Sequence, residues 1–522
     1  MFDCILWESS VATGCSGSFF APSVANLVSV IRAENDYPKS GHFGKEIMKT
    51  RQTSIKFRLW AAALVLPVFS AQAGTTFTSL YSFSGGNDGY SPNALVQGND
   101  GYFYGTTING GTNGDGSVFK ISTSGALKSL YSFTGGNDGY SPQGLLQGSD
   151  GFFYGTTQYG GKPTVGAPAG TVFQLSPNGA LTNLYSFNVD FPGGNNGSYP
   201  VAGLVQGSNG NFYGTTFEGG TYGFSNSGTN GFGTVFKIST NGALTSLYPF
   251  SGGNDGANPA AGLVQCSDGN FYGTTQSGGT SNSGTVFKIN TNATTPIEAL
   301  TSLYSFTGGN DGGGPLAGLV QGGDGYFYGT TTGGGTSNSG TVFKIGTSGA
   351  LTNLYSFTGG DDGANPDAGL VFGSDGNFYG TTQFGGTNGG EGTVFRITAK
   401  GAFTSLYSFS GGNDGGGPLG VLVQGSDGSF YGTTFGGGQG SAGTVFRLTV
   451  ELGPPQLVIT PSAANVILTW PTNPTGFSLQ STTNLVSPVW RTNSPVPIVV
   501  NGRNTVTNPI SGTQQLFRLS QQ

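Results

Sequence analysis

The sequence has very little of the chemistry on which most enzymes and metal sites depend. Its 522 residues include one histidine, His42, and three cysteines, Cys4, Cys15 and Cys266, and only 8% of the residues are charged. The histidine and the first two cysteines all precede residue 74. The chain from residue 74 onward therefore cannot supply a Ser-His-Asp triad, a His/Cys zinc site or an internal disulfide.

Basic residues are also scarce. After residue 73 the sequence has 12 Lys and Arg residues against 20 Asp and Glu residues. Such an acidic chain lacks the positive charge with which proteins bind phosphate backbones and anionic lipid. We therefore expect no nucleic-acid partner.

The N-terminal segment has the pattern of a targeting signal. Residues 49–58 contain four basic side chains, residues 59–69 are apolar, and Ala71-Gln72-Ala73 provides small residues for cleavage. The apolar run is too short to span a bilayer. We expect a signal peptide at 48–73 and an exported protein, extracellular or at the cell surface, without a transmembrane segment. Residues 1–47 are interpreted as an unstructured leader from a wrong start codon, and a genuinely long leader is the alternative.

Glycine is abundant, with 98 residues, and 39 Phe and 22 Tyr are spread regularly between the glycines. This combination favours a folded, turn-dense β protein over a flexible tract. Leu-Tyr-Ser-Phe, Tyr-Gly-Thr-Thr and Gly-Thr-Val-Phe, or close forms of them, each occur seven times. The Tyr-Gly-Thr-Thr motif starts at Tyr104, Tyr154, Tyr213, Tyr272, Tyr328, Tyr379 and Tyr431.

Each repeat contains four candidate strands. In the fourth repeat they are residues 262–265, 270–275, 285–289 and 300–306. Four short strands in a repeat of about 50 residues are typical of a propeller blade. The side chains of these strands are apolar on both faces, as a sheet packed between two neighbours requires.

The two ends of the repeat region complement each other. Residues 77–83 form a fourth strand without its first three, and residues 420–448 form three strands without a fourth. Pairing them would remove the exposed sheet edges of a linear array. The sequence thus predicts an all-β fold, with a seven-bladed β-propeller of four-stranded antiparallel blades over 75–450. Its N-terminal strand closes the last blade. An open β-solenoid is the alternative.

Two longer motifs carry a family resemblance. Leu-Val-Gln-Gly-Ser-Asp-Gly-x-Phe-Tyr-Gly-Thr-Thr and Gly-Thr-Val-Phe-Lys-Ile resemble the GloVer-type tandem repeat of exported bacterial proteins, some of which carry C-terminal anchors. The glycine pairs also resemble those of Kelch-type propellers. The resemblance covers residues 75–450 and implies no assigned activity and no catalytic residues.

A different pattern follows the linker Gly453-Pro454-Pro455. Residues 456–522 alternate apolar and polar side chains in about five candidate strands, with Trp470 expected in the core. The candidate strands are residues 456–459, 465–470, 476–480, 495–500 and 516–519. We expect a small Ig- or fibronectin-like β-sandwich, similar to C-terminal modules of secreted bacterial proteins. Surface attachment and simple capping are both open as its role.

The longest insertions predict a ligand site. In a four-stranded meander, the second-to-third loops and the blade-crossing loops share one rim, and loops on a rigid scaffold often bind ligands. The loops at 158–170 and 217–233 and the crossing at 188–200 are expanded, and Lys162 lies in the first of them. Their aromatic and acidic residues suit stacking on sugars or on a protein; simple packing of the loops is the alternative. The candidate ligand-binding residues are Tyr159, Asp190, Tyr199, Phe217, Glu218, Tyr222, Phe224 and Phe232.

We expect an exported, monomeric, non-catalytic binding or display protein for an extracellular glycan or protein. One alternative is a carbohydrate-active enzyme that uses two unrepeated rim acids, and another is a purely structural cell-surface component. The repeated Asp-Gly segments indicate turns, with calcium binding as their alternative and no other cofactor expected. The unrepeated acids are Asp115, Asp190, Glu218, Asp361, Asp367 and Glu391.

Overall fold

The computed structural model describes most of the chain after residue 73. The described residues are 74–163, 166–189, 196–221, 231–293, 295–451, 457–462, 465–471, 477–483, 489–492, 496–500, 503–509 and 515–521. The expected leader and signal peptide lie outside them, as do Asp190, Tyr222 and Phe224. In the described part, no helix is long and apolar enough to cross a membrane.

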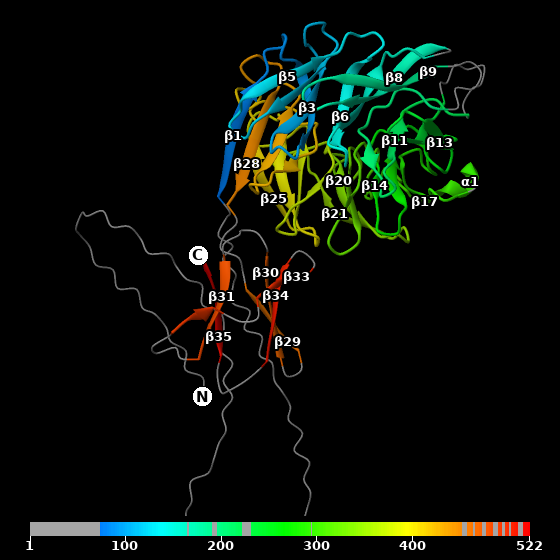
Figure 1. Cartoon of the computed structure of the whole chain (residues 1–522). Coiled ribbons are helices and arrows are strands. Elements are labelled where there is room, and N and C mark those ends of the chain that lie inside the picture. The colour runs from blue at the N-terminus through cyan, green and yellow to red at the C-terminus, as the bar shows by residue number, and fades with distance from the viewer. Residues whose placement is uncertain are drawn as a thin grey trace, which may run out of the picture.

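The repeat region folds into seven four-stranded antiparallel sheets, numbered here in chain order (Figure 1). Sheet 1 contains β2 (Tyr90–Gln97), β3 (Phe103–Asn109), β4 (Ser117–Ile121) and β5 (Leu127–Ser132), and sheet 2 contains β6 (Tyr140–Gln147), β7 (Phe153–Tyr159), β8 (Ala167–Leu175) and β9 (Leu181–Val189). Sheet 3 contains β10 (Val205–Gln206), β11 (Phe212–Thr216), β12 (Thr234–Ile238) and β13 (Leu244–Pro249). Sheet 4 contains β14 (Val264–Gln265), β15 (Phe271–Thr275), β16 (Thr285–Ile289) and β17 (Leu300–Ser305). Sheet 5 contains β18 (Val320–Gln321), β19 (Phe327–Thr331), β20 (Thr341–Ile345) and β21 (Leu351–Ser356). Sheet 6 contains β22 (Val371–Phe372), β23 (Phe378–Thr382), β24 (Thr393–Ile397) and β25 (Phe403–Ser408). Sheet 7 contains β26 (Val423–Gln424), β27 (Phe430–Thr434) and β28 (Thr444–Val450), together with β1 (Thr75–Ser82).

The Phe-Tyr-Gly-Thr-Thr strands form the centre of every sheet. Every residue of β15 is buried, because the preceding sheet covers one of its faces and the following sheet covers the other. Its Phe271 stacks on Tyr213 of the preceding sheet at 4.1 Å, and its Tyr272 packs on Phe327 of the following sheet at 4.4 Å. Successive side chains of a strand point to opposite faces, so the Phe-Tyr pair joins each sheet to both neighbours.

These aromatic contacts form a closed series. A Tyr of one sheet packs on a Phe of the next at centroid distances of 3.9–4.4 Å, and the last pair, Tyr431 and Phe103, joins sheet 7 to sheet 1 at 4.0 Å. The pairs are Tyr104–Phe153, Tyr154–Phe212, Tyr213–Phe271, Tyr272–Phe327, Tyr328–Phe378, Tyr379–Phe430 and Tyr431–Phe103. The Thr433 hydroxyl also donates across this last junction to the carbonyl of Asn93 (3.0 Å).

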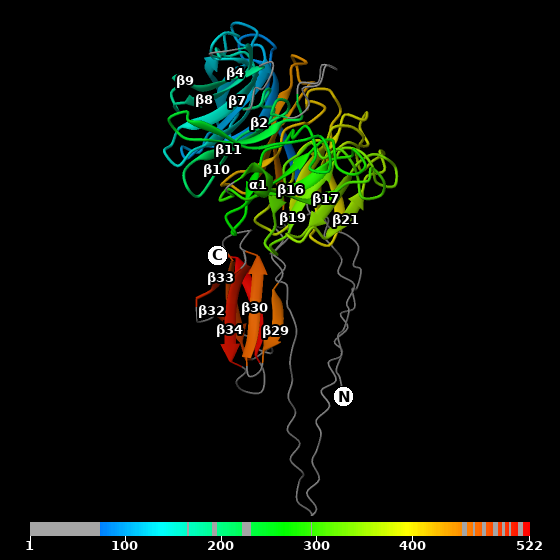
Figure 2. The ribbon, with the colours of Figure 1, turned by 90° about the vertical axis from the view of Figure 1, so that its right-hand side faces the viewer.

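The ends of the repeat region pair as the sequence predicts. β1 is antiparallel to β28, with Phe77 opposite Leu448 and Ser82 opposite Thr444, and the Phe83 amide donates to the Gly443 carbonyl. In Figure 1 this pair appears as adjacent blue and orange strands, and Figure 2 shows the repeat region from the side. Phe77 also stacks on Tyr407 of sheet 6 at 4.0 Å, so β1 contributes to a junction between sheets as well.

Two sheets form the C-terminal part. One contains β29 (Val458–Ser462), β30 (Asn465–Pro471), β34 (Arg503–Pro509) and β33 (Ile498–Val500); the other contains β32 (Arg491–Thr492), β31 (Phe477–Thr482) and β35 (Leu516–Gln521). Residues from both sheets share one core around Trp470, which is 1% exposed, as expected. The sequence pattern missed β34 because this strand turns only Val506 and Asn508 inward, so it shows no apolar alternation.

The strand limits of the repeats differ from expectation in two places. In sheet 4 the first strand is only Val264–Gln265, and a short helix, α1 (Pro296–Ala299), precedes β17. The insertions of sheet 2 are also not simply loops. β8 begins at Ala167, which pairs with Val189 at the end of β9, so parts of the expected loop and crossing extend the sheet instead.

Candidate functional site

The two rims of the repeat region carry different connections. In sheet 1 the loop 110–116 and the crossing 133–139 lie at one end of the strands, and the tight turns 98–101 and 122–126 lie at the other. The same order recurs in each sheet. We call the first end the loop rim and the second the turn rim.

The repeated aspartates are bound within the scaffold on both rims. On the loop rim, Asp88 accepts hydrogen bonds from the hydroxyl of Tyr81 (3.0 Å) and the amide of Ser84 (2.8 Å). Five other crossing aspartates accept the same Tyr bond: Asp138, Asp255, Asp311, Asp362 and Asp414. Burial, together with the hydrogen bond to Asp88, raises the pKa of Tyr81 to about 12. These contacts give the acids a structural role as turn residues.

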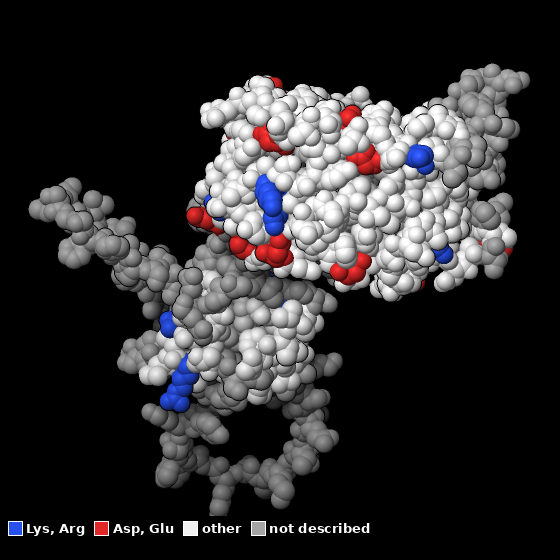
Figure 3. Space-filling model, turned by 45° about the horizontal axis from the view of Figure 1, so that its top comes forward, with Lys and Arg blue, Asp and Glu red and all other residues white. Residues whose placement is uncertain are grey.

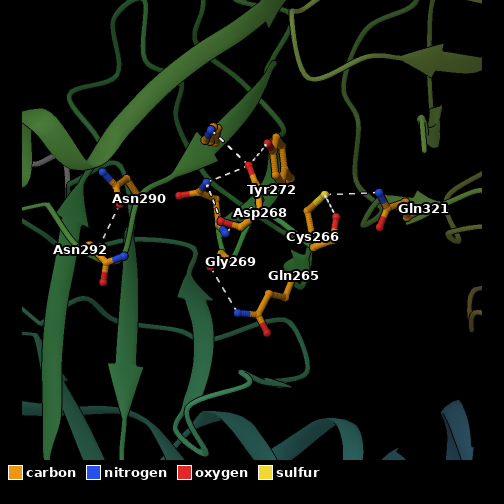
Figure 4. A network of polar contacts seen from close by, with 11 residues as sticks. Gln265, Cys266, Asp268, Gly269, Tyr272, Asn290, Asn292 and Gln321 are labelled. Carbon is orange, nitrogen blue, oxygen red and sulfur yellow. Dashed lines mark hydrogen bonds and ion pairs between the residues drawn. The ribbon is translucent and has the colours of Figure 1, made fainter.

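The turn-rim aspartates have similar contacts (Figure 4). Asp268 accepts from the Tyr272 hydroxyl at 2.9 Å and lies 3.3 Å from the Lys288 ammonium. Burial opposes ionisation of Asp268, but the hydrogen bonds outweigh it and lower its pKa to about 2. Beside this turn, Cys266 is buried and free, and its sulfur accepts from Gln321 Nε2 at 3.3 Å.

Three tyrosines gather on the loop rim where sheets 2 and 3 meet. Tyr140 and Tyr159 stack at 5.1 Å, and the ring of Tyr199 stands edge-on to Tyr159 at 5.6 Å. Tyr140 is 38% exposed, so part of its ring faces solvent. Burial and the negative charge of Glu218 raise the pKa of Tyr199. Four aromatic or acidic side chains from two sheets therefore form one surface.

Tyr199 has an unfavourable backbone conformation. Its φ is +56°, a region that side chains other than Gly, Asn and Asp rarely adopt. The corresponding residues of the other sheets, Ser91, Ser141, Asn258, Gly314, Asn365 and Gly417, also have positive φ, and all of them are small or Asn. A tyrosine is therefore not needed for the turn, and such strain is typical of functional positions.

A second pair of exposed aromatic side chains lies on the loop rim and was not predicted from sequence. Tyr90 of sheet 1 is 37% exposed and lies 6.4 Å from the ring of Phe435 of sheet 7, which is 38% exposed. Tyr90 and Tyr140 occupy a position that is Ser, Ala or Gly in the other five sheets. We call Tyr90, Tyr140, Tyr159, Tyr199 and Phe435 the aromatic track. Comparing the residue before each Ser-Pro or Asn-Pro across repeats could have revealed Tyr90 and Tyr140.

The structure places the remaining predicted residues differently. The Phe217 amide donates to the Tyr199 carbonyl (3.0 Å), and Glu218 pairs with Ser198 in an isolated bridge. The backbones of these two residues therefore lie beside Tyr199 at one end of the track. Phe232 instead packs toward sheet 4, where its ring fills the space beside Gly252. The backbone amide of Lys162 donates to the hydroxyl of Ser186 (3.0 Å).

Asp367 stands apart among the unrepeated acids. It directly follows the proline of its crossing, at the inner end of the loop rim. The residues that follow the corresponding prolines of sheets 3, 4, 5 and 7 are apolar: Val201, Ala260, Leu316 and Leu419. Burial raises its pKa to about 6, with a partly opposing contribution from the Thr332 hydroxyl. Its Oδ1 is buried without a hydrogen-bond partner. In the described residues, no three His, Cys, Asp or Glu side chains are grouped to hold a metal ion.

Fold and repeats together define a β-rich tandem-repeat protein. The chain belongs to the Gloeobacter/Verrucomicrobia repeat family, whose model matches residues 67–229, 222–308 and 294–466. This match confirms the resemblance derived from the repeated motifs. No curated protein matches the chain.

Several solved structures align at low similarity. The extracellular domain of BT4673 from B. thetaiotaomicron is 10% identical with a TM-score of 0.44, and the alignment covers 84% of this chain and 54% of that domain. A Xanthomonas campestris gluconolactonase is 10% identical (TM-score 0.37; 72% and 90% covered), and a Pyrococcus horikoshii acylaminoacyl peptidase is 8% identical (0.39; 74% and 57%). None is similar enough to lend its activity to this chain.

Proposed function

We propose that the protein is an exported, non-catalytic binding or display protein. Its repeat region would be a closed seven-bladed β-propeller followed by a C-terminal β-sandwich. Its loop rim would bind an extracellular glycan or protein through the aromatic track. The closed series of Tyr–Phe contacts and the β1–β28 pairing support the propeller. The core that the two C-terminal sheets share supports the sandwich.

One observation carries the binding proposal. Tyr90, Tyr140 and Tyr199 occupy scaffold positions at which other sheets have small residues or Asn, and Tyr199 does so at positive φ. Tyr199 packs partly on the core between sheets 2 and 3, but Tyr90 and Tyr140 leave more than a third of their surface exposed to water. Partly exposed aromatic rings are suited to stacking on sugar rings or apolar side chains.

The test replaces track residues by those of sister sheets. Tyr140→Ala copies Ala257 and Ala364, and Tyr199→Asn copies Asn258. We expect the double variant to keep its melting temperature within a few degrees and to bind glycan-array or protein ligands of the wild type at least about tenfold more weakly, since each aromatic contact contributes about 1 kcal/mol or more.

Tyr102→Ala is the matched control. Tyr102 is also 38% exposed but lies on the turn rim. It should leave binding unchanged. Equal ligand capture by the double variant and the wild type would remove the track from the function.

The carboxylate-enzyme alternative is favoured by a single observation, the raised pKa of Asp367 at the inner loop rim. Hydrolysis of a glycosidic bond needs a second carboxylate within about 5–10 Å. Appearance of shortened products from a captured glycan would support this alternative. The structural alternative predicts retention of the protein on cells without any captured ligand.

A further inference from the structure

Charge is divided unequally between the two rims. Within the described part of the repeat region, Lys162 is the one basic residue on the loop rim. The acids on that rim are Asp88, Asp115, Asp138, Glu218, Asp255, Asp311, Asp361, Asp362, Asp367, Glu391 and Asp414. The turn-rim half carries equal numbers of each sign: Asp100, Asp150, Asp268, Glu298, Asp324, Asp375, Asp427 and Glu451 against Lys120, Lys128, Lys237, Lys288, Lys344, Arg396, Lys400 and Arg447.

The acids of the two rims also differ in the side chains with which they pair. On the turn rim, Lys120, Lys288 and Lys344 lie 3.7, 3.3 and 2.7 Å from Asp100, Asp268 and Asp324. The repeated loop-rim aspartates accept hydrogen bonds from Tyr, Ser and Thr instead, which leaves their charge uncompensated. Burial opposes ionisation of Asp88 and Asp311, yet these hydrogen bonds lower both pKa values, so both are ionised at neutral pH.

Charged side chains are few on the face in Figure 3, where most of the surface is neither acidic nor basic. Salt screens exposed charges beyond about 8–10 Å, so each loop-rim acid acts on groups close to it. Because acids recur around the rim, a ligand lying along it meets a negative field at several places rather than one chelating group. Such a field concentrates cations and repels anions. It therefore excludes uronic or sulfated polymers as the preferred ligand of the aromatic track.

At sheet 3, an acidic and an aromatic side chain of the loop rim lie close together. Glu218 is close enough to the Tyr199 ring to influence its pKa. Ser198, which pairs with Glu218 and precedes Tyr199, is 1% exposed, and its hydroxyl has no hydrogen-bond partner. A buried unsatisfied hydroxyl is unusual and is satisfied by a bound water or by a ligand.

We propose that the loop rim binds a cationic glycan, an oligomer of amino sugars with free, protonated amino groups. This inference rests on the proposed binding function of the aromatic track. The pyranose rings would stack on the track while their ammonium groups meet the carboxylate field and the ring faces. A rigid sugar fits better than a lysine-rich peptide, because each ordered lysine loses about 1.5–2 kcal/mol of side-chain entropy.

The test compares three probes by calorimetry on the full exported chain. They are a glucosamine oligomer, the N-acetylglucosamine oligomer of equal length, and a lysine peptide of equal charge, all at a pH at which the amines are protonated. We expect the glucosamine oligomer to bind at least about tenfold more tightly than either of the others. Its affinity should fall as salt rises.

Two charge variants locate the effect. Asp361 stands where all six other crossings have Asn, so Asp361→Asn restores the sister residue; combined with Glu391→Gln it removes two loop-rim charges. The double variant should bind the glucosamine oligomer several-fold more weakly and bind the N-acetylglucosamine oligomer as the wild type does. The control, Glu298→Gln with Glu451→Gln, removes two turn-rim charges and should have no effect.

Each contrary outcome has a distinct meaning. Equal affinity for the two sugar oligomers would overturn the cationic preference and leave the proposed binding function intact. Tighter binding of the lysine peptide would overturn the glycan in favour of a basic protein partner. Failure of all three probes, together with unchanged ligand capture by the Tyr140→Ala and Tyr199→Asn double variant, would overturn the proposed function itself.

Discussion

Deletion of residues 74–83 is expected to abolish cooperative folding of the repeat region. β1 supplies the fourth strand of sheet 7, and Phe83, which is 0% exposed, lies in the core between sheets 7 and 1. Truncating one buried Phe commonly destabilises a domain by about 3–5 kcal/mol, and a whole domain is stable by only about 5–15 kcal/mol. Calorimetry should show a transition lowered by more than about 10 °C, or none.

Removal of residues 457–522 is the control for this deletion. The C-terminal core consists only of residues from that part of the chain. Its loss should therefore leave the transition of the repeat region within a few degrees of the full chain. A deletion of β1 that unfolds at the wild-type temperature would mean that the sheets do not depend on closure.

Gly273→Val should destabilise the protein by several kcal/mol. A Cβ at Gly273 would lie 2.6 Å from Phe287 Cζ and 2.7 Å from Leu263 Cδ2, both of them in buried side chains. Even modest overpacking of a core costs about 1–3 kcal/mol, and the two further methyl groups of valine have no free space to enter. Chemical denaturation should show a lower midpoint with an unchanged slope.

Gly436→Ala tests whether the effect at Gly273 comes from packing. The space around Gly436 is open, with nothing within 4 Å of an added Cβ, and its φ does not lie in the region reserved for glycine. This variant should change stability by less than about 0.5 kcal/mol. A similar loss in both variants would indicate that glycine is needed for backbone freedom and not to accommodate the phenylalanine.

The repeated strands were predictable because period and alternation act together. Phe271 and Tyr272 are adjacent apolar residues in a five-residue strand, which requires burial on both faces, and both are buried. The orphan strand before Phe83 was likewise predicted to pair with the strand ending near Leu448, and it does. By contrast, β34 was missed because most of its residues are polar and only Val506 gives an apolar inward signal.

The candidate site was only partly predictable. Insertion lengths pointed to Tyr159 and Tyr199, which the structure brings to 5.6 Å. They could not reveal Tyr90, which begins β2, or Phe435, which lies in a loop of ordinary length. These two residues meet only because sheets 7 and 1 are neighbours. The positive φ of Tyr199 and the raised pKa of Asp367 also depend on backbone geometry and burial, which no local pattern encodes.

The closure of the repeat region is the claim on which the continuous loop rim depends. The most direct test is a disulfide between Thr76→Cys and Thr449→Cys, in a chain whose native cysteines are changed to serine, because these residues lie directly opposite in β1 and β28. We predict near-complete cross-linking on mild oxidation, while Thr76→Cys with Thr404→Cys, which lies in sheet 6, stays reduced. Free thiols in folded Thr76→Cys/Thr449→Cys protein would contradict the closed ring.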